Sequence, residues 1–274
     1  MSVTLGPPNE LFEIASRSHP GLVREANEDH CATFFAEDCA GLVVADGVSG
    51  FNGAETASRL AVEVTLEAFL DAEKSLPLSK RLHRAVQRAN IAVHDLALVV
   101  PELRGMATTL TAVLLAQGEL CAAHIGDCRL YLARAGRLLQ LTKDHTVAAQ
   151  QLRLRLLSKT RARRHPGWST LTRSLGRELI ARVDQFSAPI LAGDLLMLCS
   201  DGVHGLLDDA ELLAACGDRS AEGACEALIS AAHERGSPDN VTAAVARVSG
   251  TASTPPDGQG LLGRLNRTFG RRSF

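Results

Sequence analysis

The order of the predicted elements favours an α+β fold in which antiparallel sheets are flanked by paired helices. Strand patterns come first, then two helices, many strands, two more helices and a last strand. No repeating strand–helix–strand rhythm is present, so a parallel, doubly wound sheet is not expected. The chain has 274 residues, 46% of them hydrophobic, enough to bury one large core or two small ones.

The first forty-five residues predict three strands. One begins at 12–15, and two antiparallel strands cover 31–35 and 41–45. Between them, residues 17–30 form a polar loop dense in charge. Two helices follow. The first has Asn52 as its expected N-cap and apolar residues at helical spacing up to about Ala72. The second has Ser79 as its expected cap and cannot continue through Pro101.

The rest of the chain is predicted to be rich in strands until two late helices. Residues 144–176 are polar and strongly basic, and they predict a short helix and a loop. The expected strands are 108–116, 119–125, 128–133, 138–141, 186–190, 194–199 and 241–248, and the expected helices are 208–216 and 222–234. From Gly250 the composition changes to Thr, Ser, Pro, Gly and Arg. We therefore expect one folded domain over residues 1–249, of a size typical of catalytic domains, and a basic, disordered tail over 250–274.

Composition excludes several functional classes. The net charge of −2 gives no general attraction to nucleic acid, and no stretch reaches the roughly 20 apolar residues of a membrane span. The first ten residues do not resemble a secretory signal. The seven cysteines form no CxxC pair and no zinc spacing, which favours small buried thiols in a reducing compartment. These features predict a cytoplasmic protein.

One short pattern occurs twice. Residues 42–47 (Leu-Val-Val-Ala-Asp-Gly) are an apolar run that ends on an aspartate and a glycine, and residues 195–203 repeat it with Asp201 and Gly202. Each run predicts a buried strand that delivers one carboxylate at its end. Each alone is equally well an ordinary strand–turn junction. Together they predict two walls of one oxygen-rich metal site.

Other acidic residues also stand beside predicted strand ends or turns. Hard divalent cations such as Mg²⁺ and Mn²⁺ prefer oxygen ligands, and clustered carboxylates repel one another unless a cation neutralises them. Arg24 lies four residues before Glu28 and suits a phosphate clamp, because its guanidinium is planar and always charged. The full acidic set is Glu28, Asp29, Asp46, Asp127, Asp201 and Asp239.

Here the sequence resembles the metal-dependent protein serine/threonine phosphatases of type 2C, in their compact bacterial form. Seven motifs occur in the family's order and spacing over roughly residues 10–248. They are 24–29 (Arg-Glu-Ala-Asn-Glu-Asp), 44–47 (Val-Ala-Asp-Gly), 105–110 (Gly-Met-Ala-Thr-Thr-Leu), 126–129 (Gly-Asp-Cys-Arg), 141–146 (Leu-Thr-Lys-Asp-His-Thr), 200–202 (Ser-Asp-Gly) and 239–242 (Asp-Asn-Val-Thr).

The resemblance implies a four-layer α-β-β-α sandwich with a metal site in a cleft at one end. It implies that Asp46 bridges two Mn²⁺ or Mg²⁺ ions and that the Gly47 carbonyl joins it on one of them. The same resemblance assigns Asp201 and Asp239 to the other ion and Asp127, with Asp201, to a third, weaker one.

The remaining implied roles lie around these ligands. Glu28 acts through bound water, Asp29 and Asn240 support the ligands from behind, and Arg24 grips the substrate phosphate. The implied reaction is direct attack of metal-activated water on phosphorus, in which Arg24 and Asp46 are catalytic. This agrees with the general view of phosphoryl transfer as positioning and charge neutralisation.

The chain departs from the family pattern at a few positions. Val48 replaces a histidine that eukaryotic relatives carry, which leaves the general acid unassigned, with His204 or a metal-bound water as substitutes. Ala107 replaces a glycine. The segment 144–170, which matches the family's flap, is unusually rich in arginine, including Arg161, Arg163 and Arg164, and suggests recognition of acidic or phosphorylated partners.

Three other interpretations compete with this one. A phosphatase of the haloacid dehalogenase type needs a second aspartate two residues after the first, and Val48 excludes it. A catalytically silent domain that binds phosphoproteins would be expected to have lost a metal ligand. A metal-binding regulatory domain of unrelated fold does not account for seven ordered motifs. The sequence therefore predicts a phosphoprotein phosphatase that neither binds nucleic acid nor spans a membrane. It is predicted to act as a monomer and to oppose a bacterial Ser/Thr kinase.

Overall fold

The computed structural model describes residues 4–5, 10–48, 50, 52–116, 118–162 and 165–250. The predicted basic tail beyond Gly250 lies outside the described residues, as do Arg163 and Arg164 of the arginine-rich segment.

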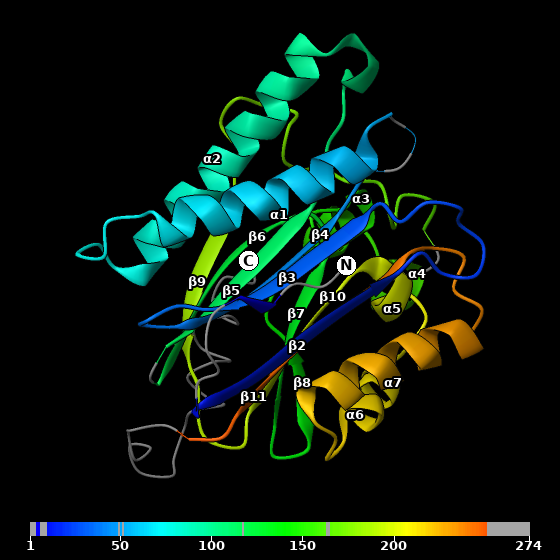
Figure 1. Cartoon of the computed structure of the whole chain (residues 1–274). Helices are drawn as coiled ribbons and strands as arrows, with labels where there is room; N and C mark the ends of the chain where they lie inside the picture. The colour runs from blue at the N-terminus through cyan, green and yellow to red at the C-terminus, as the bar shows by residue number, and fades with distance from the viewer. Residues whose placement is uncertain are drawn as a thin grey trace.

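Two sheets face each other at the centre of the described part of the chain (Figure 1). The first contains, in spatial order, β1 (Thr4–Leu5), β3 (Asp29–Phe35), β4 (Ala40–Asp46), β5 (Leu110–Ala116), β6 (Glu119–Ile125) and β9 (Asp184–Pro189). The second contains β2 (Phe12–His19), β11 (Val241–Val248), β10 (Leu195–Cys199), β7 (Arg129–Arg134) and β8 (Arg137–Gln140). Every pair of neighbours is antiparallel except β1 and β3, where the two residues of β1 run parallel to β3.

Helices cover the outer faces of both sheets (Figure 1). The long helices α1 (Ala54–Leu70) and α2 (Leu78–Val99) pack on the first sheet, and α6 (Asp209–Cys216) and α7 (Ala221–Glu234) pack on the second. The short helices α3 (Val147–Arg153), α4 (Lys159–Ala162) and α5 (Asp201–His204) lie toward one end of the sandwich, and a 3₁₀ turn covers Pro101–Leu103. The predicted α-β-β-α sandwich is confirmed.

Three hydrophobic clusters explain why the sequences of the strands are apolar on both faces. One lies between the sheets and includes Leu42, Leu130 and Leu198. The others lie between each sheet and its helices, with Val43 and Phe69 in one and Met197 and Leu228 in the other. Since successive strand residues point to opposite faces, a strand in this architecture is buried on both sides.

The helix starts show where local prediction was wrong. The N-cap of α1 is Gly53, not Asn52, and it has a left-handed φ of 87° and no side-chain cap. Helix α2 begins after Pro77, so Ser79 lies within its first turn. By contrast, α6 begins with a capping box, in which Asp208 and Glu211 exchange hydrogen bonds.

All seven cysteines are buried and unpaired, as predicted. None of the described helices is both long and apolar enough to cross a lipid bilayer.

Candidate metal centre and substrate cleft

Two aspartates meet at the end of the first sheet. Asp29, the first residue of β3, is the register partner of Asp46, the last residue of β4. Asp29 is buried, and its Oδ2 accepts a 2.7 Å hydrogen bond from the Ser200 hydroxyl at the end of β10. Asp46 is only partly buried. The antiparallel pairing thus brings the two aspartates side by side, with Asp29 buried and Asp46 partly exposed.

Two threonines hold the backbone of Asp46 in place. The Asp46 amide donates to Thr109 Oγ1 at 2.9 Å, and its carbonyl accepts from the Thr109 amide and the Thr108 hydroxyl, both at 2.8 Å. The sequence motif 105–110 carried the family resemblance, but its physical role was missed. The structure shows that it fixes Asp46 from both sides of the peptide.

Gly47 follows Asp46 in a space that excludes a side chain. A Cβ there would lie 2.4 Å from the Ala54 carbonyl oxygen and 2.8 Å from that of Glu28. The Gly47 amide donates to the Glu28 carbonyl at 3.0 Å. The Asp-Gly step is therefore required by close backbone packing as well as by the turn.

Asp127 enters the same region from the link between the two sheets, and Asp201 enters it from the second sheet. Asp127 is buried in the link between β6 and β7, next to Gly126, whose φ is +106°. Asp201 follows β10 and begins α5, where it is partly buried. The single-turn helix α5 was not predicted, because four residues are too few to show a helical period.

A buried asparagine ties the loop that carries Arg24 to the end of the second sheet. Asn240 accepts from the Glu28 amide at 2.8 Å and donates to the carbonyls of Pro20 and Ala26, both at 2.9 Å. Beside it, Asp239 pairs with Arg24 at 3.1 Å. The arginine predicted to hold phosphate is thus placed over the acidic cluster.

The carboxylates of this cluster raise one another's pKa. Burial is the main cause throughout: it raises the pKa of Asp29 to about 7 and that of Asp201 to about 6. Hydrogen bonds from Thr242 and Ser200 oppose the shift at Asp29, and Arg24 opposes it at Asp201. The pKa values of Asp46 and Asp127 also lie well above the usual range, because burial is reinforced by charge repulsion from Asp201.

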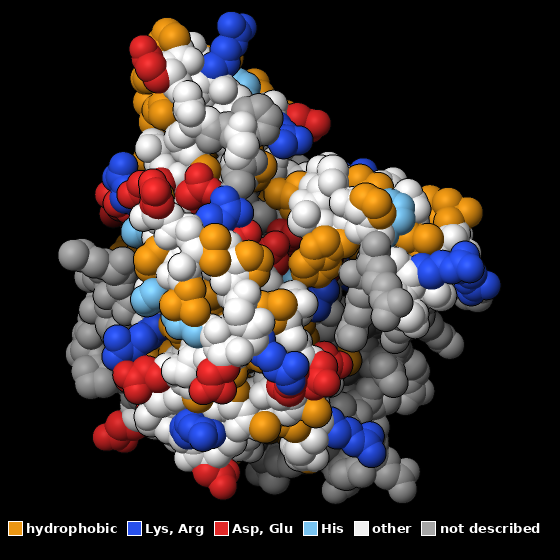
Figure 2. Space-filling view, turned by 90° about the vertical axis from the view of Figure 1, so that its right-hand side faces the viewer, with side chains coloured by type: hydrophobic (Ala, Val, Ile, Leu, Met, Phe, Trp, Pro, Cys, Tyr) orange, Lys and Arg blue, Asp and Glu red, His pale blue; other side chains and the backbone are white. Residues whose placement is uncertain are grey.

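Most of these residues line one cleft of about 380 Å³. On the face shown in Figure 2, acidic side chains lie at the floor of a hollow with hydrophobic and basic side chains around it. Of the predicted residues, the cleft brings together Arg24, Asp46, Gly47, Asp127, Asp201 and Asp239. Asp29 and Asn240 lie behind it, and Glu28 takes part through its backbone bonds to Gly47 and Asn240.

Sequence reasoning missed several other residues that line the cleft. They are Thr109, Ser169, Thr170, Leu171 and Arg177, with Val48 beside them. Thr170 reaches the cleft because the segment after α4 folds back, so that the Val147 amide donates to the Thr170 carbonyl at 2.9 Å. No local sequence motif predicts that these two residues, more than twenty positions apart, lie next to each other.

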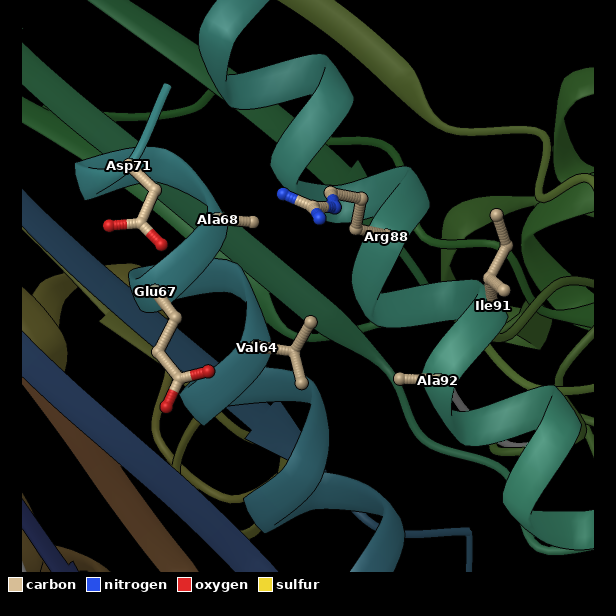
Figure 3. Close-up of a pocket in the computed structure, with 7 residues that line it drawn as sticks. All are labelled: Val64, Glu67, Ala68, Asp71, Arg88, Ile91 and Ala92. Atoms are coloured by element: carbon tan, nitrogen blue, oxygen red, sulfur yellow. The ribbon is translucent and has the colours of Figure 1, made fainter. Parts of the chain in front are cut away.

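A second, shallower cavity is separate from this site. It lies between α1 and α2 and is lined by Val64, Glu67, Ala68, Asp71, Arg88, Ile91 and Ala92 (Figure 3). Arg88 extends from α2 toward α1, while Glu67 lies on α1 and Asp71 is the C-cap residue of that helix. None of the predicted site residues takes part in it.

Comparison with known proteins identifies the family. A family model described as protein phosphatase 2C matches residues 23–234. The chain belongs to the protein phosphatase 2C family. This phosphatase 2C chain is 33% identical to the serine/threonine phosphatase stp of Listeria innocua over 231 residues, which cover 82% of this chain and 92% of that protein.

Two further matches come from a mycobacterial phosphatase. The serine/threonine protein phosphatase PstP of Mycobacterium tuberculosis is 37% identical over 239 residues, covering 87% of this chain and 45% of PstP. A crystal structure of the PstP catalytic domain in complex with two manganese ions superposes with a TM-score of 0.76 and 35% identity, covering 87% of this chain and 99% of that one. The predicted family is confirmed.

The residues of this phosphatase 2C cleft fit hard divalent ions. Its donors are carboxylates and a carbonyl, the ligands that Mg²⁺ and Mn²⁺ prefer, and their mutual repulsion favours a bound cation. Among the described residues, no group of three or more His, Cys, Asp or Glu side chains is by itself arranged to hold an ion. This is consistent with ions that keep several water ligands and take only one or two carboxylates each.

His204 is a poor substitute for the histidine that Val48 replaces. Its side chain is buried, its Nε2 lies 3.0 Å from the Asp127 carbonyl, and its ring meets Trp168 edge-on at 6.1 Å. Burial, with Arg129 nearby, lowers the pKa of His204 to about 3. The imidazole is therefore neutral near pH 7 and lacks the imidazolium proton that a general acid would give to a leaving group.

Proposed function

We propose that this protein phosphatase 2C hydrolyses phosphoserine and phosphothreonine in proteins with Mn²⁺ or Mg²⁺ as cofactor. The observation that carries the proposal is the convergence of Asp46, Asp127, Asp201 and Asp239 with Arg24 in one cleft. Relatives named as serine/threonine phosphatases, and the manganese-bound PstP domain, support it.

The chain's own residues take distinct roles in this proposal. Asp46 and the Gly47 carbonyl would hold two core ions together with Asp201 and Asp239. Asp127 and Asp201 would hold a third, and Glu28 would act through water. When bound, such ions lower the pKa of a coordinated water and neutralise phosphate charge.

The other residues position the substrate and the ligands. Arg24 binds the substrate phosphate with its guanidinium fork, and its contact with Asp239 keeps the fork over the carboxylates. Thr108 and Thr109 fix the backbone of Asp46. Because all the carboxylates are present in one cleft, the catalytically silent alternative has no support.

The catalytic domain is proposed to span 1–249, with 250–274 as a tail. A bacterial Ser/Thr kinase is proposed to make the substrates, because a phosphatase of phosphoproteins needs a kinase that acts on the same residues. The monomeric state and the cytoplasmic location stay predictions of the sequence.

The decisive test is hydrolysis of a phosphothreonine peptide. We expect turnover with manganese, none after chelation, and a loss of about a hundredfold or more in Asp239→Asn, which keeps the shape of the side chain but removes its charge. The matched control is Asp218→Asn, at an exposed position outside the cleft, which should behave as wild type. If the folded wild type shows no turnover with manganese or magnesium, the proposal fails and a phosphoprotein-binding role replaces it.

Metal binding should depend on pH. In the metal-free protein, the raised pKa values mean that these carboxyl groups destabilise the folded state increasingly as the pH rises above their unfolded pKa, and in full above their folded pKa. Protons therefore compete with the ions as the pH falls through about 7 to 6. We expect manganese to raise Tm more at about pH 7.5 than at about pH 5.5. Thermal unfolding with manganese and with chelator at both pH values measures this, and an equal rise at both would contradict it.

A further inference from the structure

A second arginine reaches the cleft from a loop that the predicted site does not include. Arg177 lines the cleft together with Arg24. Arg24 comes from the loop between β2 and β3, whereas Arg177 comes from the chain leading into β9. Arg177 is exposed, while the carboxylates at the floor are partly or fully buried. The arginine therefore stands at the rim of the cleft.

The loop that carries Arg177 is built into the protein core. Asn90, a fully buried residue of α2, accepts from the Gly176 amide at 2.9 Å and donates to the carbonyls of Glu178 and Leu179 at 2.9 and 3.0 Å. Three hydrogen bonds from one buried amide thus fix the backbone on both sides of Arg177. Asn240 holds the Arg24 loop in the same manner, also with three bonds.

Gly176 makes this anchoring possible. Its φ is +90°, and a Cβ would lie 2.6 Å from Val93 Cγ1 and 3.0 Å from the Met106 carbonyl oxygen. The chain at Gly176 therefore lies directly against α2 and the segment before β5. Such packing costs conformational freedom and indicates a loop with one defined position.

The same loop is joined to the residues that hold Asp46. Leu175 and Thr108 exchange two backbone hydrogen bonds, of 2.8 and 3.2 Å, and the Thr108 hydroxyl donates to the Asp46 carbonyl. Arg177 is therefore two residues along the chain from Leu175, whose pair of backbone hydrogen bonds to Thr108 joins the loop to the support of Asp46. Its position is set by the same framework as the catalytic aspartate.

We infer that Arg177 is a specificity residue, which binds a second anionic side chain on the phosphoprotein substrate while Arg24 holds the phosphate to be removed. The inference rests on the proposed function. A guanidinium at the rim of an acidic cleft meets the residues next to the phosphorylated one, and it pairs with a carboxylate or a second phosphate. Substrates with such a group near the phosphothreonine are preferred.

The test compares phosphothreonine peptides that differ at one position. Glutamate, or the non-hydrolysable phosphonate analogue of phosphoserine, replaces alanine in turn at each position within about three residues of the phosphothreonine. We expect at least one acidic peptide to have a kcat/KM about fivefold above the alanine peptide, the size of an exposed ion pair. The two anionic groups show whether a carboxylate or a second phosphate is preferred.

Variants of Arg177 assign this preference to its guanidinium. Arg177→Gln should bring the ratio of acidic to alanine peptide close to one, and Arg177→Lys should keep part of it. Arg182→Gln, at an exposed arginine that is not among the described residues lining the cleft, should keep the wild-type ratio.

Three results would overturn the inference. They are a wild type that does not distinguish the peptides, a preference that survives Arg177→Gln, and an equal loss on all peptides and on p-nitrophenyl phosphate, which would put Arg177 on the reacting phosphate. In each of these results the wild type still shows metal-dependent turnover, so the proposed function stands. Absence of metal-dependent turnover in the wild type is a different result, since it would remove the proposed function and the inference together.

Discussion

Asp46→Asn is expected to lower kcat for a phosphothreonine peptide by about a thousandfold with manganese present. Asparagine keeps the size of the side chain and one oxygen, but it loses the negative charge proposed to bridge two cations. The backbone hydrogen bonds to Thr108 and Thr109 do not involve the side chain and should persist. The loss should therefore arise from the metal centre and not from unfolding. Steady-state kinetics over a range of manganese concentrations measures it.

Thermal stability in the absence of metal distinguishes loss of the metal centre from unfolding as the cause of the lost activity. In the wild type, burial and the neighbouring Asp29 and Asp201 raise the pKa of Asp46, so its charged form costs stability above that pKa. Asparagine removes that cost, and the chelated variant should melt no lower than the chelated wild type at neutral pH. A variant that keeps activity within about tenfold of wild type would refute the central role of Asp46.

Gly202→Ala is expected to cause the largest loss of stability among single glycine changes near the cleft. A Cβ at this position would lie 1.9 Å from the Asn240 carbonyl oxygen and 3.0 Å from its carbon. Backbone atoms of α5 and of the segment before β11 would have to separate. We expect the free energy of unfolding to fall by about 3 kcal/mol and Tm by about 6–12 °C. Urea and thermal unfolding measure both quantities.

Gly223→Ala is the matched control for this change. Gly223 lies in helix α7, and the nearest atom to its added Cβ is the Ser220 hydroxyl oxygen at 3.3 Å, at the end of a side chain that can turn. Alanine is the better helix former, so the change in stability should stay within about 1 kcal/mol. A Gly202→Ala protein as stable as this control would mean that α5 and Asn240 are not closely packed.

The fold could be predicted from sequence because its signals are local. Apolar runs marked the strands, and turns at Gly118 and Gly136 marked two hairpins, so 241–248 and most other strands fell at their observed positions. The two long-helix starts could not be predicted in the same way. The N-cap of α1 is a glycine, Gly53, because a Cβ there would lie 2.6 Å from Leu103 Cδ2. This contact joins residues fifty positions apart and cannot be read from the local sequence.

The residues of the site were likewise predictable only where a local sequence motif marks them. Aspartates that end apolar strands have a recognisable pattern, and their convergence stays close to what their motifs predicted. Arg177 has no such pattern. It reaches the cleft because Asn90, 86 positions before Gly176, holds its loop against α2. Thr108 and Thr109 were found as a motif, but their function as supports of Asp46 needed the hydrogen bonds.

The seven buried cysteines give this protein a built-in reporter of global opening. A thiol reagent reacts with the thiolate, and burial raises the pKa of every one of these thiols, so the closed protein offers almost no reactive sulfur. Cys128 follows Asp127 between the two sheets and lies 3.2 Å from the Thr109 hydroxyl, whereas Cys225 is in α7 on the outer face of the second sheet. The order in which such thiols become labelled would show whether the cleft end of the sandwich opens separately or only with the whole domain.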